Sequence, residues 1–160
     1  MSAALLQDND KCNELEDDRE SCLHVLTWIA LRFTKHTISG SSSNKFLRAF
    51  DEEYETVEGV KGGDLKKGFL VCRDIPRLVK FDHRPQLDAL IRELTEAFTT
   101  CYEEPHPHGD FEALKDMKSN NAPMYYLHSN SAFKYQKCLD DLATPSWLVD
   151  TFHRYLNADS

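Results

Sequence analysis

The chain alternates between apolar segments with helical spacing and short polar stretches. Residues 17–33 stand out, because their apolar positions spread around nearly the whole axis of a helix instead of forming one stripe. These positions are Cys22, Leu23, Val25, Leu26, Trp28, Ile29, Ala30, Leu31 and Phe33. The apolar part is only about a dozen residues long and contains Arg32, so it is too short and too polar to span a membrane. The pattern predicts a buried helix, at about 18–34, in the centre of the fold.

Polar residues mark the predicted boundaries of this helix. Asp17 and Glu20 are three positions apart, which is the spacing of a capping box at a helix start. Residues 1–16 contain few apolar side chains after Leu6, so we expect a loop with at most a short helix. The serine-rich segment 39–43 is expected to be a flexible connector.

Further segments with helical spacing follow the connector. We expect helices at 45–54, 64–72, 84–102, 111–118 and 132–142, and a last one that begins at Pro145. The strongest periodicity lies within 84–102, where the apolar positions are Leu87, Leu90, Ile91, Leu94, Phe98 and Cys101. Extended pieces are expected only near Val57 and at 124–127. The predicted fold class is therefore all-α, with residues 1–160 forming a single domain.

Composition and charge narrow the classes of partner. The chain has a formal net charge of −8 and a pI near 5.3, and its lysines and arginines do not form a long cluster. Surfaces that bind nucleic acid or anionic membranes need clustered positive charge. We therefore expect neither nucleic acid nor a membrane as a partner.

The cysteines indicate a reducing compartment. Their number is five, they are widely spaced, none forms a C-x-x-C pair, and no signal peptide is recognisable. We expect reduced thiols in an intracellular protein, either cytoplasmic or nuclear. Cys22 and Cys101 both lie on apolar helix faces, so core packing is expected for both.

Few residues have the spacing of a catalytic or metal site. His106 and His108, with Cys101 upstream, could be zinc ligands, but they lack the usual ligand spacings, and a solvated proline-rich loop explains them better. The acidic run 51–55 is expected to face water. The glycines of 59–64 lack the spacings of phosphate-binding loops. A small metal-dependent or thiol enzyme therefore stays a minor alternative.

The start of the predicted central helix resembles a known family. Asp18-Arg-Glu-Ser21 is similar to the D-x-x-S start of the central helix in protein-kinase C-lobes, and more specifically to fungal-type protein kinases. There the helix reads approximately H-D-L-E-S-x-x-H/Y-V-L-x-W-I. The positions that match are Asp18, Glu20, Ser21, His24, Val25, Leu26, Trp28 and Ile29. The resemblance implies structural roles for Asp18, Ser21 and Trp28 in a kinase-like helix.

The resemblance extends to both sides of this helix. Residues 1–6 look like the family's M-S-A-E-L-L, the counterpart of the A-P-E segment, although Ala4 replaces the glutamate that anchors that segment to an arginine. Residues 62–70 and 102–105 are also similar to the family. The match is best over 17–105, and 106–160 reads as a weaker helical extension.

The resemblance implies no catalytic residue, cofactor site or metal site in this chain. The glycine-rich loop, the V-A-I-K lysine and D-F-G would all lie before Met1. Cys72-Arg73-Asp74 mimics H-R-D, but Val79 stands where the magnesium-binding asparagine belongs. ATP and Mg²⁺ are expected only for a full-length family member, so this chain alone is not expected to be an enzyme.

Two functions follow as expectations. The first is a non-catalytic C-lobe fragment of a fungal-type protein kinase, a family that resembles Ser/Thr-type ATP-dependent kinases. The alternative is a stand-alone helical protein-interaction module, such as a pseudokinase-like decoy or scaffold. The fragment is expected to bind a protein partner through apolar surface left uncovered by the missing kinase portion, whereas the decoy or scaffold is expected to bind what the parent kinase binds.

Overall fold

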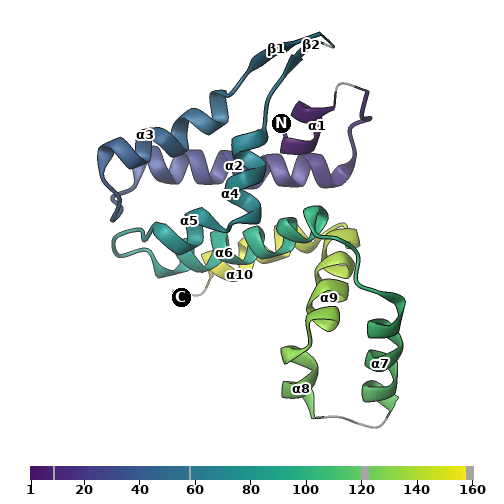
Figure 1. Ribbon diagram of the computed structural model, residues 1–160. Coiled ribbons are helices and arrows are strands. Elements are labelled where there is room, and N and C mark those ends of the chain that lie inside the picture. The colour runs from purple at the N-terminus through teal and green to yellow at the C-terminus, as the bar shows by residue number, and fades with distance from the viewer. Residues whose placement is uncertain (9, 58, 120–122, 158–160) are drawn as a thin grey trace.

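The computed structural model describes residues 1–8, 10–57, 59–119 and 123–157, and most of them are helical (Figure 1). This confirms the predicted predominance of helices. The helices are α1 (Ala3–Gln7), α2 (Leu15–Phe33), α3 (Gly40–Arg48), α4 (Asp64–Val71), α5 (Asp74–Leu78), α6 (Pro85–Thr99), α7 (His108–Ser119), α8 (Met124–Ser129), α9 (Ser131–Ala143) and α10 (Trp147–Leu156). Two 3-10 turns, η1 (Ala49–Asp51) and η2 (Thr100–Tyr102), and two strands, β1 (Tyr54–Thr56) and β2 (Gly59–Lys61), complete the described elements.

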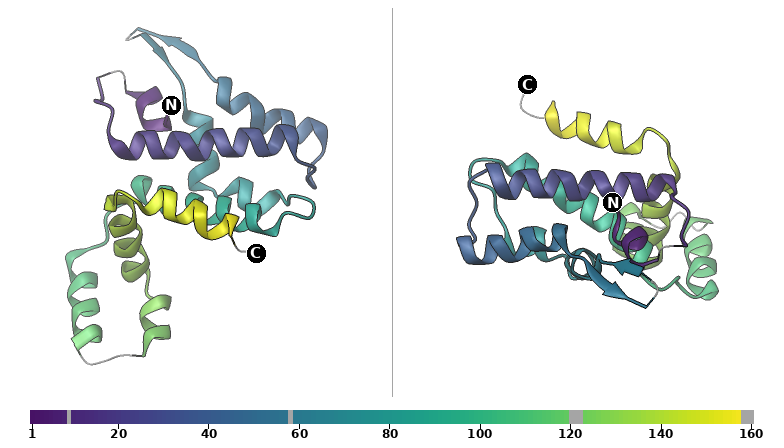
Figure 2. Two further views of the ribbon diagram at one scale, coloured as in Figure 1. Left: turned by 180° about the vertical axis from the view of Figure 1, so that it is seen from behind. Right: turned by 90° about the horizontal axis from the view of Figure 1, so that it is seen from above.

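The helix at the centre of the fold is α6. It begins with Pro85 in its first turn, as predicted, and it packs against α2, α4, α5, α9 and α10 (Figures 1 and 2). Its buried apolar residues are Leu90, Ile91, Leu94, Ala97 and Phe98. The prediction that the helix at 18–34 is the buried centre is therefore wrong. The regular apolar spacing of 84–102 marked the true central helix.

The start of α2 differs from the predicted capping box. The helix begins at Leu15, and the Asp17 carboxylate accepts a hydrogen bond from the Glu14 backbone N–H at 3.0 Å. Glu20 plays no part in this cap. Both acids instead bind the N-terminal segment: the Ser2 hydroxyl donates to Asp17 at 2.7 Å, and the Ala3 N–H donates to Glu20 at 2.7 Å. These bonds hold α1 against the first turns of α2.

Two predicted boundaries after α2 were wrong. The serine-rich segment belongs to α3, whose N-cap is Ser39. The helix expected at 45–54 ends early, because β1 and β2 pair as an antiparallel hairpin with Tyr54 opposite Lys61. The hairpin confirms extended structure near Val57, whereas 124–127 lies in α8. Gly62 follows the hairpin, and a Cβ there would lie 2.2 Å from the Glu52 carbonyl oxygen, so the close approach of these backbones requires glycine.

The C-terminal part of the chain forms an arm and a returning helix. α7, α8 and the start of α9 project away from the rest, and α10 runs back along α6 (Figures 1 and 2). Arg19 of α2 fixes the corner between α9 and α10. Its buried guanidinium donates to the carbonyl oxygens of Thr144 at 3.0 Å and Pro145 at 2.9 Å, and also to that of Leu142. The corner between α9 and α10 is thus joined to the first turns of α2.

Candidate functional site

One face of α2 is left uncovered and is apolar. Val25 is 56% exposed, Ile29 46% and Phe33 72%. With Leu15, Asp18 and Cys22, these residues fall within one face of the helix, which we call the outer face of α2. In the view from behind, α2 lies in front of α4, and no helix is drawn over it (Figure 2). The prediction that this helix is buried on nearly every side is therefore wrong.

The buried side of α2 carries much of its polar chemistry. Arg19, Glu20, His24 and Thr27 are buried there together with Leu23, Ala30 and Leu31. This is the reverse of an ordinary surface helix, whose polar side faces water. Contiguous exposed apolar surface of this kind marks interaction sites. No helix in the described part of the chain is long and apolar enough to cross a membrane.

Trp28 lies at the edge of the outer face and is half-buried. Its ring meets the ring of Phe33 edge-on, with centroids 6.0 Å apart, and the Arg32 guanidinium lies 5.4 Å from its centroid. Such contacts hold the Trp28 and Phe33 rings in fixed positions at the C-terminal end of the face. Trp28 thus contacts residues of its own helix, and its role in a kinase-like helix stays a prediction.

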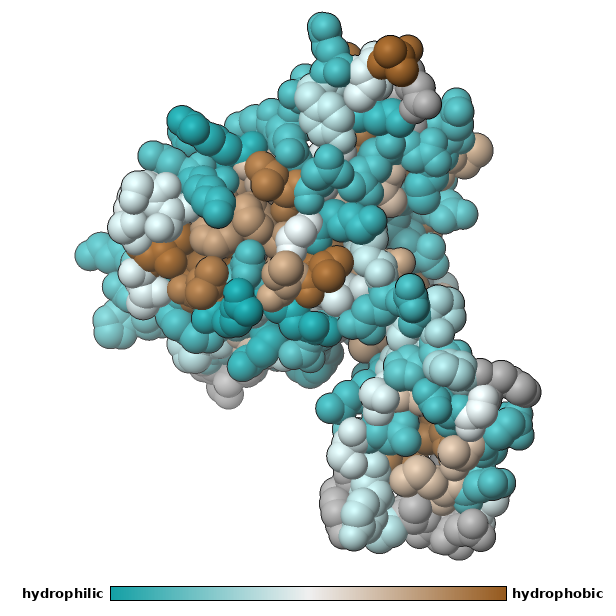
Figure 3. Space-filling view, in the orientation of Figure 1, coloured by the Kyte–Doolittle hydropathy of each residue, from teal (hydrophilic) through white to brown (hydrophobic). Residues whose placement is uncertain are grey.

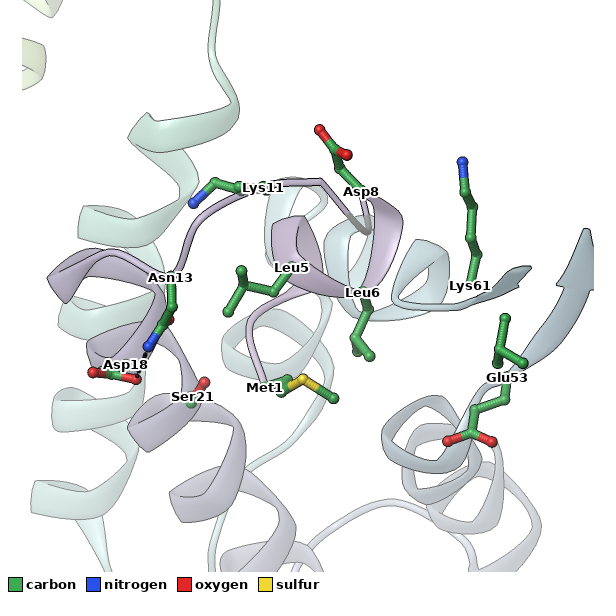
Figure 4. A pocket seen from close by; sticks show the side chains of 11 residues that line it. Met1, Leu5, Leu6, Asp8, Lys11, Asn13, Asp18, Ser21, Glu53 and Lys61 are labelled. Atoms are coloured by element: carbon green, nitrogen blue, oxygen red, sulfur yellow. Dashed lines mark hydrogen bonds between the residues drawn. The ribbon is translucent and has the colours of Figure 1, made fainter. Parts of the chain in front are cut away.

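A hollow of about 780 Å³ lies at the N-terminal end of the outer face (Figure 4). Its apolar lining comes from Met1, Leu5, Leu6 and Val60, and its acidic lining from Asp8, Asp18 and Glu53. In Figure 4 the three side chains from residues 1–6 lie between Asp18 on one side and Glu53 on the other. The remaining lining residues are Lys11, Asn13, Ser21 and Lys61.

Asp18 and Ser21, both expected from the resemblance, are brought together at this hollow. Asp18 is exposed and accepts a hydrogen bond from the Asn13 side-chain amide at 3.2 Å. It does not cap α2, because Glu14 and Asp17 form the capping box. The Ser21 hydroxyl donates to the Asp17 carbonyl oxygen at 2.7 Å. Trp28 lies two turns further along α2 and is not part of the hollow.

The floor of the hollow is held by hydrogen bonds to α1. The Gly62 N–H donates to the Leu6 carbonyl oxygen at 2.9 Å, and the Gln7 side chain donates to Asp64 at 2.6 Å. Gly63 is in the left-handed region, and a Cβ there would lie 2.9 Å from the Ala3 carbonyl oxygen. α1 is therefore fixed from both sides, by α2 and by the Gly62-Gly63 segment, although Ala4 cannot form an anchoring ion pair.

Glu20 is the polar centre beneath α1. Its carboxylate accepts hydrogen bonds from the Ala3 N–H, from His24 Nε2 at 2.9 Å and from the Tyr102 hydroxyl at 2.7 Å. Burial would raise the pKa of Glu20, but these three donors outweigh it and hold the pKa below its ordinary value. Burial and the nearby Glu20 raise the pKa of Tyr102. Sequence reasoning missed this cluster, since only the i, i+4 spacing of Glu20 and His24 hinted at it.

The candidate zinc ligand His106 has other partners. His106 bonds Asp110 through Nδ1 at 3.1 Å, and its ring packs edge-on against Tyr135 with centroids 5.2 Å apart. The side chain of His108 lies outside the described residues. Within the described residues, no group of three or more His, Cys, Asp or Glu side chains is placed to hold a metal ion.

The cysteines are not paired, and two of them depart from the prediction. Cys22 and Cys101 are exposed, not core residues, because Cys22 lies on the outer face of α2 and Cys101 lies in η2. Although Cys101 is exposed as a residue, the protein around its thiol excludes much of the water there, and this desolvation and the nearby Glu20 raise the pKa of Cys101 to about 11. A thiol with this pKa is protonated at neutral pH, which makes it a poor nucleophile.

The acidic run and the H-R-D mimic have structural roles. Glu52 accepts a hydrogen bond from the Leu65 N–H at 2.8 Å, which satisfies a free amide at the start of α4. Asp74 pairs with Arg77 at 2.8 Å within α5, and Arg73 pairs with Glu103 at 3.1 Å. None of these contacts places two acids together for acid–base chemistry.

Two other hollows are less suited to a partner. One of about 740 Å³ lies among α6, α9 and α10, and two ion pairs occupy part of its lining: Arg154 with Glu93 at 2.8 Å, and Lys137 with Asp141 at 2.5 Å. The second hollow lies between α2, η1 and α4 and measures only about 30 Å³, which is room for about one water molecule.

Hydrophobic side chains also gather on the surface over α3, α4 and α5 (Figure 3).

No protein-family model, no curated protein and no solved structure matches this chain. The resemblance to fungal-type protein kinases therefore rests on the sequence segments within 1–105 alone, and it stays a prediction. The geometry adds two features to it, which are the uncovered outer face of α2 and the acidic hollow at its N-terminal end.

Proposed function

We propose that this chain is a kinase-like C-lobe portion of the fungal-type protein-kinase kind, without the ATP-binding and catalytic segments, and that it acts by binding protein. Its binding surface is the outer face of α2. It has no catalytic role by itself, because phosphoryl transfer depends on groups that this chain does not contain.

The uncovered outer face is the observation that carries the proposal. Covering a large apolar side chain contributes about 1.5 to 3 kcal/mol when the whole side chain is transferred from water, and roughly half of that for a side chain already half-covered. Leu15, Val25, Ile29 and Phe33 together therefore offer on the order of 4 kcal/mol. A partner, or a further segment of kinase-like chain, would gain that free energy by covering the face.

The position of α1 supports the kinase-like interpretation. Residues 1–6 resemble the segment that precedes the central helix in the family, and here they pack on the first turns of α2 through Ser2 and Ala3. Residues 1–6 and the start of α2 are thus both part of the resemblance, and they also contact each other in the fold. The alternative, a stand-alone interaction module, uses the same face and differs only in its origin.

The genomic sequence upstream of the Met1 codon separates these two forms of the proposal. An in-frame stretch that encodes G-T-W-Q-F, preceded by D-F-G and H-R-D, supports a portion of a longer kinase. Stop codons in that frame, together with a promoter, contradict it and leave the stand-alone module. Nucleotide binding by the purified 160-residue chain, measured by calorimetry with ATP and Mg²⁺, would contradict both forms.

A further inference from the structure

The outer face of α2 carries opposite charges at its two ends. Beside the N-terminal end, the hollow is lined by three acids, Asp8, Asp18 and Glu53, and by the two lysines Lys11 and Lys61. At the C-terminal end, Arg32 is exposed on α2 and Lys35 is exposed just beyond it. Cys22, Val25 and Ile29 lie between the two ends, so the face is an apolar strip with an acidic end and a basic end.

The charges at the acidic end are available to a partner. Asp18 accepts a bond only from a neutral amide, that of Asn13, and within the described residues neither Asp18 nor Glu53 forms an ion pair. Lys11, the nearest lysine of the same loop, is bound to Asp17 and Glu14. A cation from another molecule would therefore meet unpaired carboxylates beside an apolar floor.

The length of the strip fits one helix. Asp18 and Arg32 are fourteen positions apart on α2, which corresponds to about 21 Å at 1.5 Å per residue. A partner helix of about four turns covers this length and can pack its apolar side along Val25 and Ile29. Helices favour acidic residues in their first turn and basic residues in their last turn.

From this charge order we infer that the outer face of α2 binds an amphipathic helix of a partner protein, antiparallel to α2, with basic residues at its C-terminal end over Asp18 and Glu53. Its acidic N-terminal end then meets Arg32 and Lys35. A parallel helix with the same charge preference would place like charges together at both ends. The inference rests on the proposed function, that this face binds protein, and adds the chemistry and direction of the partner.

Two synthetic peptides test the inference. Both have the same composition and the same apolar stripe over about four turns, but one has acidic residues first and basic residues last, and the other has the reverse order. Fluorescence anisotropy at low ionic strength measures their binding to the full chain. Because exposed ion pairs contribute little each, we expect the acid-first peptide to bind about fivefold more tightly, with the preference lost in 1 M salt.

Charge reversal supplies the matched control. Asp18→Lys combined with Glu53→Lys makes both ends of the face basic and should remove the preference between the peptides, whereas Asp150→Lys on the exposed side of α10 should leave it unchanged. Circular dichroism checks that the variants keep their helix content, and the substituted side chains are exposed.

The outcomes separate this inference from the proposed function. Equal binding of both peptides that is abolished by Val25→Glu overturns the charge order and direction but retains the binding face. Peptide binding that survives Val25→Glu overturns both the inference and the proposed binding face, and so does the absence of binding of either peptide to the wild-type chain. A fivefold preference for the acid-first peptide that disappears in the double variant supports the inference.

Discussion

Tyr102 donates a hydrogen bond to Glu20 across 2.7 Å and thereby joins the end of the central helical segment to the buried side of α2. The same carboxylate holds the backbone of Ala3 and the ring of His24. One buried side chain thus connects α1, α2 and η2. This contact explains how the floor of the hollow is held in place.

Glu20→Gln should lower the free energy of unfolding by about 1 to 3 kcal/mol, because a buried amide cannot accept from all three donors. The pKa of Glu20 is lowered in the folded state from an ordinary value of 4.5, so its stabilisation is complete above pH 4.5 and is lost as pH falls through the folded-state pKa. The raised pKa of Tyr102 adds a loss above pH 10.0. Urea unfolding across pH should show a shallower acid loss for Glu20→Gln, and an unchanged acid slope would contradict this role.

Arg19→Met should destabilise the chain by about 2 to 4 kcal/mol. The substitution keeps much of the apolar stem but leaves the carbonyl oxygens of Leu142, Thr144 and Pro145 without their donor. Arg92→Met, on the exposed side of α6, is the matched control and should cost less than about 0.5 kcal/mol. Equal unfolding midpoints for the two variants would show that Arg19 does not fix the α9–α10 corner.

Lys66→Met should stabilise the chain at pH 7 by about 1 kcal/mol. Lys66 is buried, and burial lowers its pKa although Asp51 and Glu20 oppose the shift. Methionine keeps the apolar stem and removes the cost of the buried ammonium group. Differential scanning calorimetry measures the change in melting temperature, with Lys45→Met on exposed α3 as the control. A lower melting temperature for Lys66→Met than for the control would refute the prediction.

Two glycines near α4 should respond in opposite ways to alanine. Gly62→Ala places a Cβ against the Glu52 carbonyl oxygen, so the hairpin must move, and we expect a loss of about 2 kcal/mol or more. Gly68, within α4, has nothing within 4 Å of a built Cβ, and Gly68→Ala should gain about 0.5 to 1 kcal/mol from helix propensity. Thermal unfolding of both variants checks the pair, and a loss in both would contradict the account of Gly62.

The positions of several helices could be predicted because their apolar spacing is regular. The segments 84–102, 64–72 and 132–142 correspond closely to α6 with η2, α4 and α9. The sequence could not predict which sides of α2 are packed against other helices. Apolar residues on every side show only that burial is favourable, and they do not show which element buries each side. Extended structure near Val57 was predicted, but the first strand was assigned to the preceding helix, since Tyr54 fits the helical spacing of that segment.

The candidate site could be predicted only in part. Asp18 and Ser21 were expected from the resemblance, and both line the hollow, but the other side of it comes from α1 and the hairpin. The roles of Arg19 and Tyr102 depend on partners far away in sequence, 123 positions for Arg19 and Leu142 and 82 for Tyr102 and Glu20. No local pattern in a single sequence carries that information.

The most direct test of the outer face compares two substitutions at equally exposed valines. Val25 on α2 and Val149 on α10 are both 56% exposed, so glutamate at either position should disturb the fold equally little. We expect the wild-type chain to bind an apolar dye and to self-associate in sedimentation velocity, Val25→Glu combined with Ile29→Glu to lose most of both, and Val149→Glu to retain them. Equal dye binding and sedimentation in all three proteins would contradict the claim that this face of α2 binds protein.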